Sequence, residues 1–281
     1  MALARSSQPV EELRQAVIPM QGEAQDYDRL LELCQDRSFI MMGEASHGSH
    51  EFYQARVDIT KRLIQEQGLN AIAVEADWPA AYRINRYVRG LSEDETVEQA
   101  LGDFHRFPLW MWRNTVIHDF VQWLRDYNQG RSFESQVGFY GLDMYSMYDS
   151  IACVLDYLDE VDPEAAEQAR AGYSCLDDTQ DEQAYGFGVM LGNRPSCEDE
   201  ALQQLMQLSE NALEYVKRNG MLAQDEQFQA EQNARLVRSA ERYYRTMFTG
   251  RVSTWNLRDR HMSDTLEALW QHLNRRNSSQ T

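Results

Sequence analysis

The segment Ala71-Ile72-Ala73-Val74-Glu75 decides the fold, because four apolar residues in a row end on a carboxylate. The run is too short for a helix and is apolar on both faces of a strand, which is typical of parallel strands covered by helices. Two similar runs flank it along the chain, Phe39-Ile40-Met41-Met42 before it and Val137-Gly138-Phe139-Tyr140 after it. We therefore predict three parallel strands joined by right-handed crossovers.

Helical periodicity fills the chain between and after these runs. Gly68 predicts the end of the first helix, Asp162-Pro163 predicts the start of another, and Ser253 or Thr254 is a plausible cap for the last. The segment from Tyr173 to Pro195, with three glycines and a proline, predicts an irregular connection. The predicted helices cover Glu51–Gln67, Pro79–Arg89, Thr96–Leu101, Thr115–Asn128, Tyr148–Leu158, a helix that opens at Pro163, Glu198–Arg218, Asp225–Met247 and Thr254–Leu273.

This order of elements predicts an α/β fold. We expect a small, mostly parallel sheet flanked by helices in three layers (α/β/α), with a largely helical second half. Residues 1–145 should form the α/β core that carries the active-site motifs, and residues 146–281 a helical layer or subdomain of the same domain.

Composition limits the class of partner. The formal net charge of −18 argues against nucleic acid and against an anionic membrane surface. The sequence has no run of about 18 apolar residues and no apolar stretch in Met1–Val10, so we expect neither a membrane span nor a signal peptide. The four cysteines form no C-x-x-C pair, which predicts reduced thiols in a cytoplasmic protein. A small molecule is the expected partner, and the oligomeric state is left open.

Carboxylates follow all three predicted strands: Glu44, Glu75 and Asp143. Ligands of open parallel sheets bind beyond the carboxyl ends of the strands, so we expect these acids to lie together at a site. The alternative is that they cap the helices that follow. That alternative is strongest for Asp143, because a helix begins soon after it.

The loop after the first run carries His47, three residues after Glu44. A histidine oriented by a carboxylate is the usual arrangement for general-base catalysis. A solvent-facing loop residue and a metal ligand are the alternatives for His47.

Arg56 lies on the apolar stripe of its predicted helix. The other members of that stripe are Phe52, Ile59 and Leu63. A buried arginine requires a carboxylate partner, and Glu44 or Glu75 is the expected one. The alternative is that Arg56 extends to the rim of the helix.

Two further groups are candidates for substrate binding. Trp78, Trp110, Trp112 and Arg113 could wall an apolar pocket, although core packing explains the tryptophans equally well. Arg258 lies in the charged segment 255–262 and either faces the strand-end acids or is ion-paired on a helix surface. The sequence has no G-x-S-x-G elbow, P-loop or G-x-G-x-x-G motif.

Taken together, several segments resemble the signature motifs of the erythromycin esterases, over residues 10 to 275. These segments are Gly43–Phe52 with Arg56, Val74–Pro79, Arg86–Gly90, Phe107–Asn114, Phe139–Asp143 and Trp255–Asp259. The resemblance implies hydrolysis of a macrolactone ester, as in macrolide resistance, without a cofactor and without a covalent intermediate.

The resemblance also implies roles for individual residues. His47 would activate water, Glu44 would position the histidine or the water, and Arg56 and Glu75 would match the family's other catalytic positions. Arg56 would then stabilise the oxyanion or pair with Glu75.

One departure from the family pattern affects the expected activity. Family members continue into a further strand with an Ala-His-Asn-x-x-His-like motif, whereas this sequence ends at Thr281. We therefore expect impaired or absent esterase activity. Two other readings remain open. One is a metal-dependent hydrolase with Glu44, His47 and Glu75 as ligands, and the other is a non-catalytic module that binds a small molecule or haem.

Overall fold

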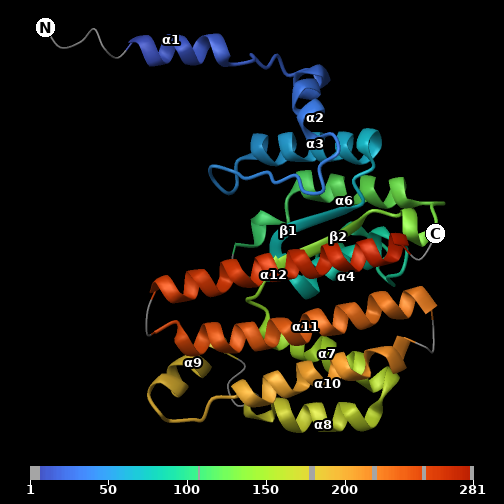
Figure 1. Ribbon diagram of the computed structural model, residues 1–281, viewed down its shortest axis with the longest axis vertical. Coiled ribbons are helices and arrows are strands. Elements are labelled where there is room, and N and C mark those ends of the chain that lie inside the picture. Colours follow the sequence, from blue (N-terminus) through green and yellow to red (C-terminus); the bar gives the residue numbers. More distant parts are fainter. Residues whose placement is uncertain (1–6, 107, 177–180, 217–219, 249–250, 279–281) are drawn as a thin grey trace, which may run out of the picture. The chain divides into compact units, whose positions relative to one another are not determined.

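The computed structural model describes residues 7–106, 108–176, 181–216, 220–248 and 251–278. The chain divides into two compact units, Met1–Leu69 and Asn70–Thr281. Figure 1 labels the strands and most of the helices of both. The predicted division of the family domain near residue 145 stays a prediction.

The first unit is helical. Its elements are α1 (Ser7–Ala16), the short 3₁₀ turn η1 (Ala24–Tyr27), α2 (Asp28–Cys34) and α3 (His50–Gln67). A small core of Leu31, Cys34, Ile59 and Leu63 joins α2 to α3. Gly68, in the left-handed region at φ 71°, ends α3 as predicted.

The predicted first strand at Phe39–Met42 is wrong, because the structure assigns neither helix nor strand to these residues. Ile40 and Met42 pack against the α2–α3 core, whereas Phe39 and Met41 are exposed. This alternation is that of an extended chain with one packed face. The apolar run therefore identified an extended segment without identifying a strand of the sheet.

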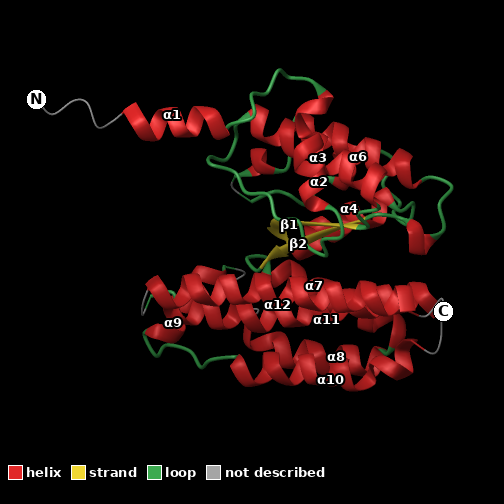
Figure 2. Ribbon diagram, turned by 45° about the horizontal axis from the view of Figure 1, so that its top comes forward, coloured by secondary structure: helices red, strands yellow, loops and turns green. Residues whose placement is uncertain are grey.

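The second unit holds the sheet. Its elements up to the second strand are β1 (Ala71–Asp77), α4 (Trp78–Val88), α5 (Val97–Ala100), η2 (Leu109–Met111), α6 (Thr115–Asn128), η3 (Phe133–Ser135) and β2 (Gly138–Asp143). β1 and β2 are parallel, with Ala71 opposite Gly138 and Asp77 opposite Asp143. Figure 2 shows the two strands between α4 with α6 on one side and α7 with α12 on the other, so the predicted α/β class with a small parallel sheet is confirmed.

Helices make up the rest of this unit. They are α7 (Met147–Val161), α8 (Pro163–Tyr173), η4 (Ser174–Leu176), α9 (Glu182–Met190), α10 (Glu198–Val216), α11 (Gly220–Thr246) and α12 (Arg251–Ser278). The long α11 contacts α7, α9, α10 and α12 around one apolar core. The largely helical second half is thus as predicted.

Several local predictions need correction. The segment from Tyr173 to Pro195, expected to be an irregular connection, contains α9. The N-cap residue of α9, Asp181, accepts hydrogen bonds from two backbone amides. Residues 177–180 of this segment lie outside the described residues. Ser253 and Thr254 lie inside α12 rather than at its cap. Cys175 and Cys197 form a disulfide, whereas Cys34 and Cys153 are free, so the expectation of four reduced thiols is wrong.

The part of the chain that is described has no helix with the length and apolar character needed to cross a membrane.

Candidate active site

In the first unit, Glu44 lies between a histidine and an arginine. One carboxylate oxygen of Glu44 is bonded to Nδ1 of His47, and the other accepts a hydrogen bond from Nη2 of Arg56. The side chain of Glu44 is only 7% exposed, whereas that of His47 is 47% exposed. The buried carboxylate therefore holds an imidazole whose other face reaches solvent.

Helix α3 supplies the arginine of this cluster. Arg56 lies one turn after Tyr53, and its guanidinium lies 4.8 Å from the centre of that ring. Of the predicted apolar stripe, Ile59 and Leu63 are buried, but Phe52 is 40% exposed. Arg56 is thus a partly buried cation that pairs with Glu44, one of the two predicted partners.

Burial also acts on Tyr53 beside this cluster. Desolvation raises the pKa of the Tyr53 hydroxyl, and the negative charge of Glu44 raises it further. The tyrosine is therefore a neutral phenol at physiological pH.

In the second unit, Arg258 joins the acids at the ends of the two strands. Its Nη2 lies 2.6 Å from Oε1 of Glu75 and 2.7 Å from Oδ2 of Asp143, and its Nε lies 3.0 Å from Oδ1 of Asp143. Asp143 therefore receives a two-pronged arginine contact. The guanidinium also lies 5.2 Å from the ring centre of Tyr145. Of the two predicted environments for Arg258, the structure shows the one that faces the strand-end acids.

Burial and pairing act in opposite directions on Arg258. Desolvation disfavours its charged form, but the hydrogen bonds and charge of Asp143, together with Glu75, raise the pKa of the guanidinium overall. The arginine is a permanent cation that compensates a buried carboxylate.

None of the three predicted acids caps a helix. The N-cap of α3 is Ser49, that of α4 is Asp77 and that of α7 is Ser146. The capping alternative therefore does not describe Glu44, Glu75 or Asp143. Glu44 follows an extended segment rather than a strand, so only Glu75 and Asp143 belong to the sheet.

Sequence reasoning missed Asp77. It is the N-cap residue of α4, yet its side chain makes no capping hydrogen bond. Its Oδ2 instead lies 3.4 Å from Nη1 of Arg106, whose guanidinium stacks over Tyr145. Burial raises the pKa of the Asp77 carboxyl to about 6, Arg106 opposes this shift and Asp143 adds to it. The spacing of Glu75 and Asp77 after one apolar run was the signal that could have identified this residue.

Sequence reasoning also left His261 without a role. It lies on α12 one turn after Arg258, is 5% exposed, and its Nδ1 has no hydrogen-bond partner. Burial lowers the pKa of this imidazole to about 4, although the charge of Asp143 acts in the opposite direction. His261 is therefore a neutral, buried neighbour of the Asp143–Arg258 pair.

The residues of the predicted aromatic wall differ in burial. Trp78 is 2% exposed and packs against Tyr140 and Phe228, as the core-packing alternative describes. Trp110 is 44% exposed, Trp112 lies beside Phe104, and Arg113 is exposed. Phe107, the first residue of that predicted motif, lies outside the described residues.

Within the described ranges, no group of three or more histidine, cysteine or acidic side chains is arranged to hold a metal ion.

Comparisons with known proteins give the family. The family model described as erythromycin esterase matches residues 64–280. Erythromycin esterase type II from Escherichia coli is 25% identical over 144 residues, which are 50% of this chain and 32% of that protein. The chain thus spans about a third of the length of this curated relative.

Solved structures share the fold. A succinoglycan biosynthesis protein superposes with a TM-score of 0.74 at 19% identity, over 96% of this chain and 64% of its own. A Bacillus cereus protein superposes with a TM-score of 0.65 at 20% identity, over 90% of this chain and 59% of that protein. A mutant of the erythromycin esterase EreC in its open conformation superposes with a TM-score of 0.61 at 16% identity, over 89% of this chain and 61% of that protein. The family model covers most of this sequence, and the chain therefore belongs to the erythromycin esterase family.

Proposed function

We propose that the chain is a hydrolase of the erythromycin esterase type, which cleaves a carboxylic ester with water activated by His47. Family membership supports the reaction class. The observation that carries the proposal is the bonding of Glu44 to both His47 and Arg56. Its expected substrate is a small molecule with a macrolactone-like ester, as in macrolide resistance.

In the proposed mechanism the two nitrogens of His47 have different tasks. Nδ1 is held by Glu44, which leaves Nε2 on the half-exposed ring to accept a proton from water. The water oxygen then attacks the ester carbonyl carbon, and Glu44 stabilises the imidazolium that forms. Collapse of the tetrahedral intermediate breaks the bond to the alcohol oxygen, which takes the proton back from Nε2. The products are a carboxylic acid and an alcohol, and no covalent enzyme intermediate is required.

Arg56 acts mainly through Glu44 in this scheme. Its Nη2 holds the carboxylate oxygen that does not contact His47, so it fixes the orientation of the pair. The guanidinium has five N–H donors, and those not used by Glu44 are available to stabilise the oxyanion.

The charged residues of the second unit, Glu75, Asp143 and Arg258, are proposed to bind substrate. Glu75 is the exposed member, at 46% of its side chain, and a carboxylate of this kind accepts hydrogen bonds from substrate hydroxyls. Arg258 and Asp143 hold it in place. Trp110, Trp112 and Arg113 are proposed as further substrate contacts.

The test is hydrolysis by the full 281-residue chain of a panel that contains erythromycin and simple aryl esters, followed by mass spectrometry. His47→Gln removes the base, and we expect kcat to fall by about 10²- to 10⁴-fold. His50→Gln is the matched control, because His50 is exposed and lies three residues after His47, at the start of α3, and it should keep full activity. Glu44→Gln should lower kcat with little change in KM.

Two results would overturn the proposal. One is a His47→Gln variant that retains the wild-type rate. The other is a folded wild-type chain that cleaves no member of the panel above the rate in buffer, an outcome that would agree instead with the impaired or absent activity expected in the sequence analysis.

A further inference from the structure

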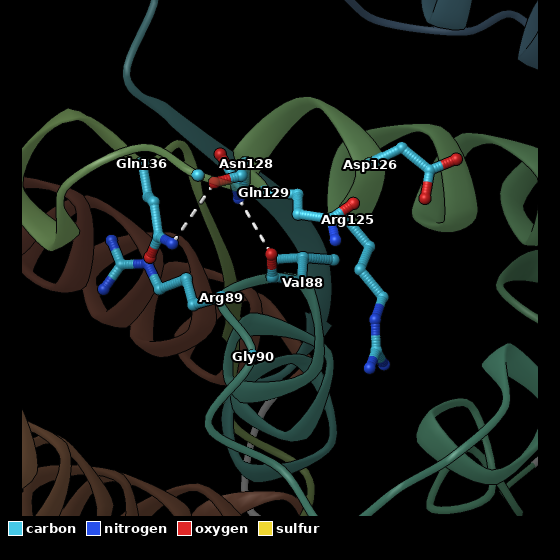
Figure 3. A pocket seen from close by; sticks show the side chains of 9 residues that line it. Val88, Arg89, Gly90, Arg125, Asp126, Asn128, Gln129 and Gln136 are labelled. Atoms are coloured by element: carbon cyan, nitrogen blue, oxygen red, sulfur yellow. Dashed lines mark hydrogen bonds between the residues drawn. The ribbon is translucent and has the colours of Figure 1, made fainter.

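The pocket at the last turns of α4 and α6 is held together by its own hydrogen bonds (Figure 3). Asn128 donates to the carbonyl oxygen of Val88 at 3.1 Å, and its backbone carbonyl accepts from Nε2 of Gln136 at 3.4 Å. These bonds join the walls to one another, so the pocket is a structural junction of the second unit. In the first unit, the side chains around Glu44 are also fixed by their neighbours, and there the contacts bear on the proposed reaction.

Arg56 reaches Glu44 through the end of a long, partly exposed side chain. Its Nη2 donates to the carboxylate, while 27% of the arginine side chain is exposed. An arginine has several rotatable bonds, and it loses their conformational freedom when it is held in one position. A second contact that restricts these bonds therefore stabilises the pair with Glu44. The ring of Tyr53 makes such a contact.

Tyr53 offers Arg56 a fixed aromatic face. The guanidinium carbon lies over the Tyr53 ring, 4.8 Å from its centre, within the distance of about 6 Å at which a ring face attracts a cation. Tyr53 itself is only 4% exposed, and its backbone amide donates to the carbonyl of Ser49 at 3.3 Å in the first turn of α3. The ring is therefore held in place, and the partly exposed arginine is the partner that could move without it.

The hydroxyl of Tyr53 lies beside the loop that carries the proposed base. Burial raises the pKa of this hydroxyl and the charge of Glu44 raises it further, whereas the backbone of Gly48 and the guanidinium of Arg56 act to lower it. Gly48 follows His47 directly and turns the chain in the left-handed region, at φ 84°. One buried side chain therefore faces the arginine, the carboxylate and the turn after the histidine.

The ring of Tyr53, rather than its hydroxyl, is the part that holds Arg56. The hydroxyl oxygen is buried and has no hydrogen-bond partner among the described residues. Removing such a hydroxyl leaves no donor or acceptor unpaired, so the loss should cost little. Removing the ring takes away the face over which the guanidinium lies.

We propose that Tyr53 is a positioning residue for the proposed hydrolysis. Its ring holds Arg56 against Glu44, and Glu44 in turn holds Nδ1 of His47, so that Nε2 stays available to water. Tyr53 acts through these residues and does not touch the reacting atoms. The inference rests on the proposed role of His47, whereas the contact of Tyr53 with Arg56 can be measured without a substrate.

The first measurement is the NMR signal of the Nε–Hε group of Arg56 in the full chain, assigned by its loss in Arg56→Lys. We expect an upfield ring-current shift and restricted motion in the wild type and in Tyr53→Phe. In Tyr53→Leu, which removes the ring but keeps apolar bulk, the signal should move to the ordinary arginine position and its heteronuclear NOE should fall. Tyr27→Leu is the matched control, because it removes a ring packed against the α2–α3 core of the same unit, and it should leave the signal unchanged.

The second measurement is the rate on a substrate that the wild type cleaves. Tyr53→Leu should lower kcat about tenfold and change KM by less than about twofold, whereas Tyr53→Phe should retain most of the rate. Because Tyr53 acts through Arg56, the double variant Tyr53→Leu with Arg56→Met should be no slower than Arg56→Met alone. A purely structural role would instead multiply the two losses.

Three outcomes overturn the inference: an unshifted Arg56 signal in the wild type, the same signal in Tyr53→Leu as in the wild type, or multiplied losses in the double variant. The first of these needs no substitution, so the test stays decisive if circular dichroism shows that Tyr53→Leu is unfolded. If the wild type cleaves no ester, the proposed function is overturned, and the NMR signals alone decide whether Tyr53 holds Arg56.

Discussion

Asp77 and Asp143 lie directly opposite each other where the two parallel strands end. Between Val74 and Asp77 the first strand has one residue more than its partner, and this bulge brings the two carboxylates into register. A Cβ atom at Gly141 would lie 2.5 Å from the carbonyl oxygen of Ala76, so the bulge requires a glycine opposite it. Each acid then takes its own arginine, Arg106 for Asp77 and Arg258 for Asp143.

The first prediction concerns the ionisation of Asp77. Burial raises the pKa of this carboxyl from 3.8 to about 6. Between these values the folded protein binds more protons than the unfolded chain, so the contribution of Asp77 to stability falls as pH rises through this window. Asp77→Asn removes the ionisation. Relative to the wild type, the Asp77→Asn variant should therefore gain unfolding free energy as pH rises. We expect the variant to compare better with the wild type at pH 8 than at pH 5 by about 1 kcal/mol.

Urea unfolding at both pH values measures this difference. Asp156→Asn, at an exposed position of α7, is the control and should show the same effect at both. A substitution effect that is independent of pH at Asp77 would show that its carboxyl has an ordinary pKa.

The second prediction concerns the pair of Arg258 and Asp143. Their side chains are only 12% and 8% exposed. Arg258→Met leaves a buried carboxylate without its cation, and we expect a loss of about 3 kcal/mol in unfolding free energy. Adding Asp143→Asn to that variant removes the unpaired charge and should restore part of the loss. Glu75→Gln, at the exposed end of the cluster, should cost under about 1 kcal/mol. Additive losses in the double variant would contradict a coupled pair.

The third prediction uses the two histidines whose pKa values shift in opposite directions. Burial lowers the pKa of His261 to about 4, whereas hydrogen bonding to Asp119 raises that of His118 despite some desolvation. A lowered pKa gives stability that is present above the unfolded value near 6.5 and is lost as pH falls towards 4. His261 should therefore make the protein about 2 kcal/mol less stable at pH 5 than at pH 7.

NMR titration of the imidazole signals measures these pKa values directly. His261→Gln should reduce the loss of stability between pH 7 and pH 5. His118→Gln should increase it, because a raised pKa contributes stability at low pH that is lost as pH rises. An apparent pKa of His261 above 6 would contradict its burial as a neutral group.

Much of the fold could be predicted from short-range signals. Helix α6 begins and ends at the predicted residues, Thr115 and Asn128, because Asn114 caps its first turn. Asp162 and Pro163 likewise start α8 as predicted. These signals are local, since a cap needs only the residues next to it. The run at Phe39–Met42 failed as a strand because pairing depends on a neighbour that no local pattern specifies.

The charged residues show the same difference between local contacts, which were predictable, and contacts between distant segments, which were not. The Glu44–His47–Arg56 cluster was predictable, because two of its members share one loop and the third lies on the next helix. Arg258 could be proposed as a partner of the acids, but its choice of Asp143 and Glu75 depends on packing over more than a hundred residues. Asp77 was missed because its burial and its place opposite Asp143 are properties of the folded sheet. The disulfide between Cys175 and Cys197 joins segments that the sequence separates by 22 residues and was missed for the same reason.

The last prediction tests why α9 was mistaken for an irregular connection. Its glycines suggested a loop, but Gly186 is buried in the helix, and a Cβ atom there would lie 2.1 Å from the backbone carbonyl oxygen of Tyr244 on α11. Gly186→Ala must therefore push α9 away from α11, and we expect a loss of about 1–3 kcal/mol in unfolding free energy. Gly188→Ala is the matched control on the same helix. Its Cβ would meet only the flexible side chain of Arg194 at 3.0 Å, and replacing glycine in a helix interior favours the helix by about 1 kcal/mol. Thermal unfolding should then place Gly188→Ala at or above the wild-type Tm and Gly186→Ala well below it. Equal Tm values for the two variants would mean that the glycine at 186 is not what lets these two helices approach.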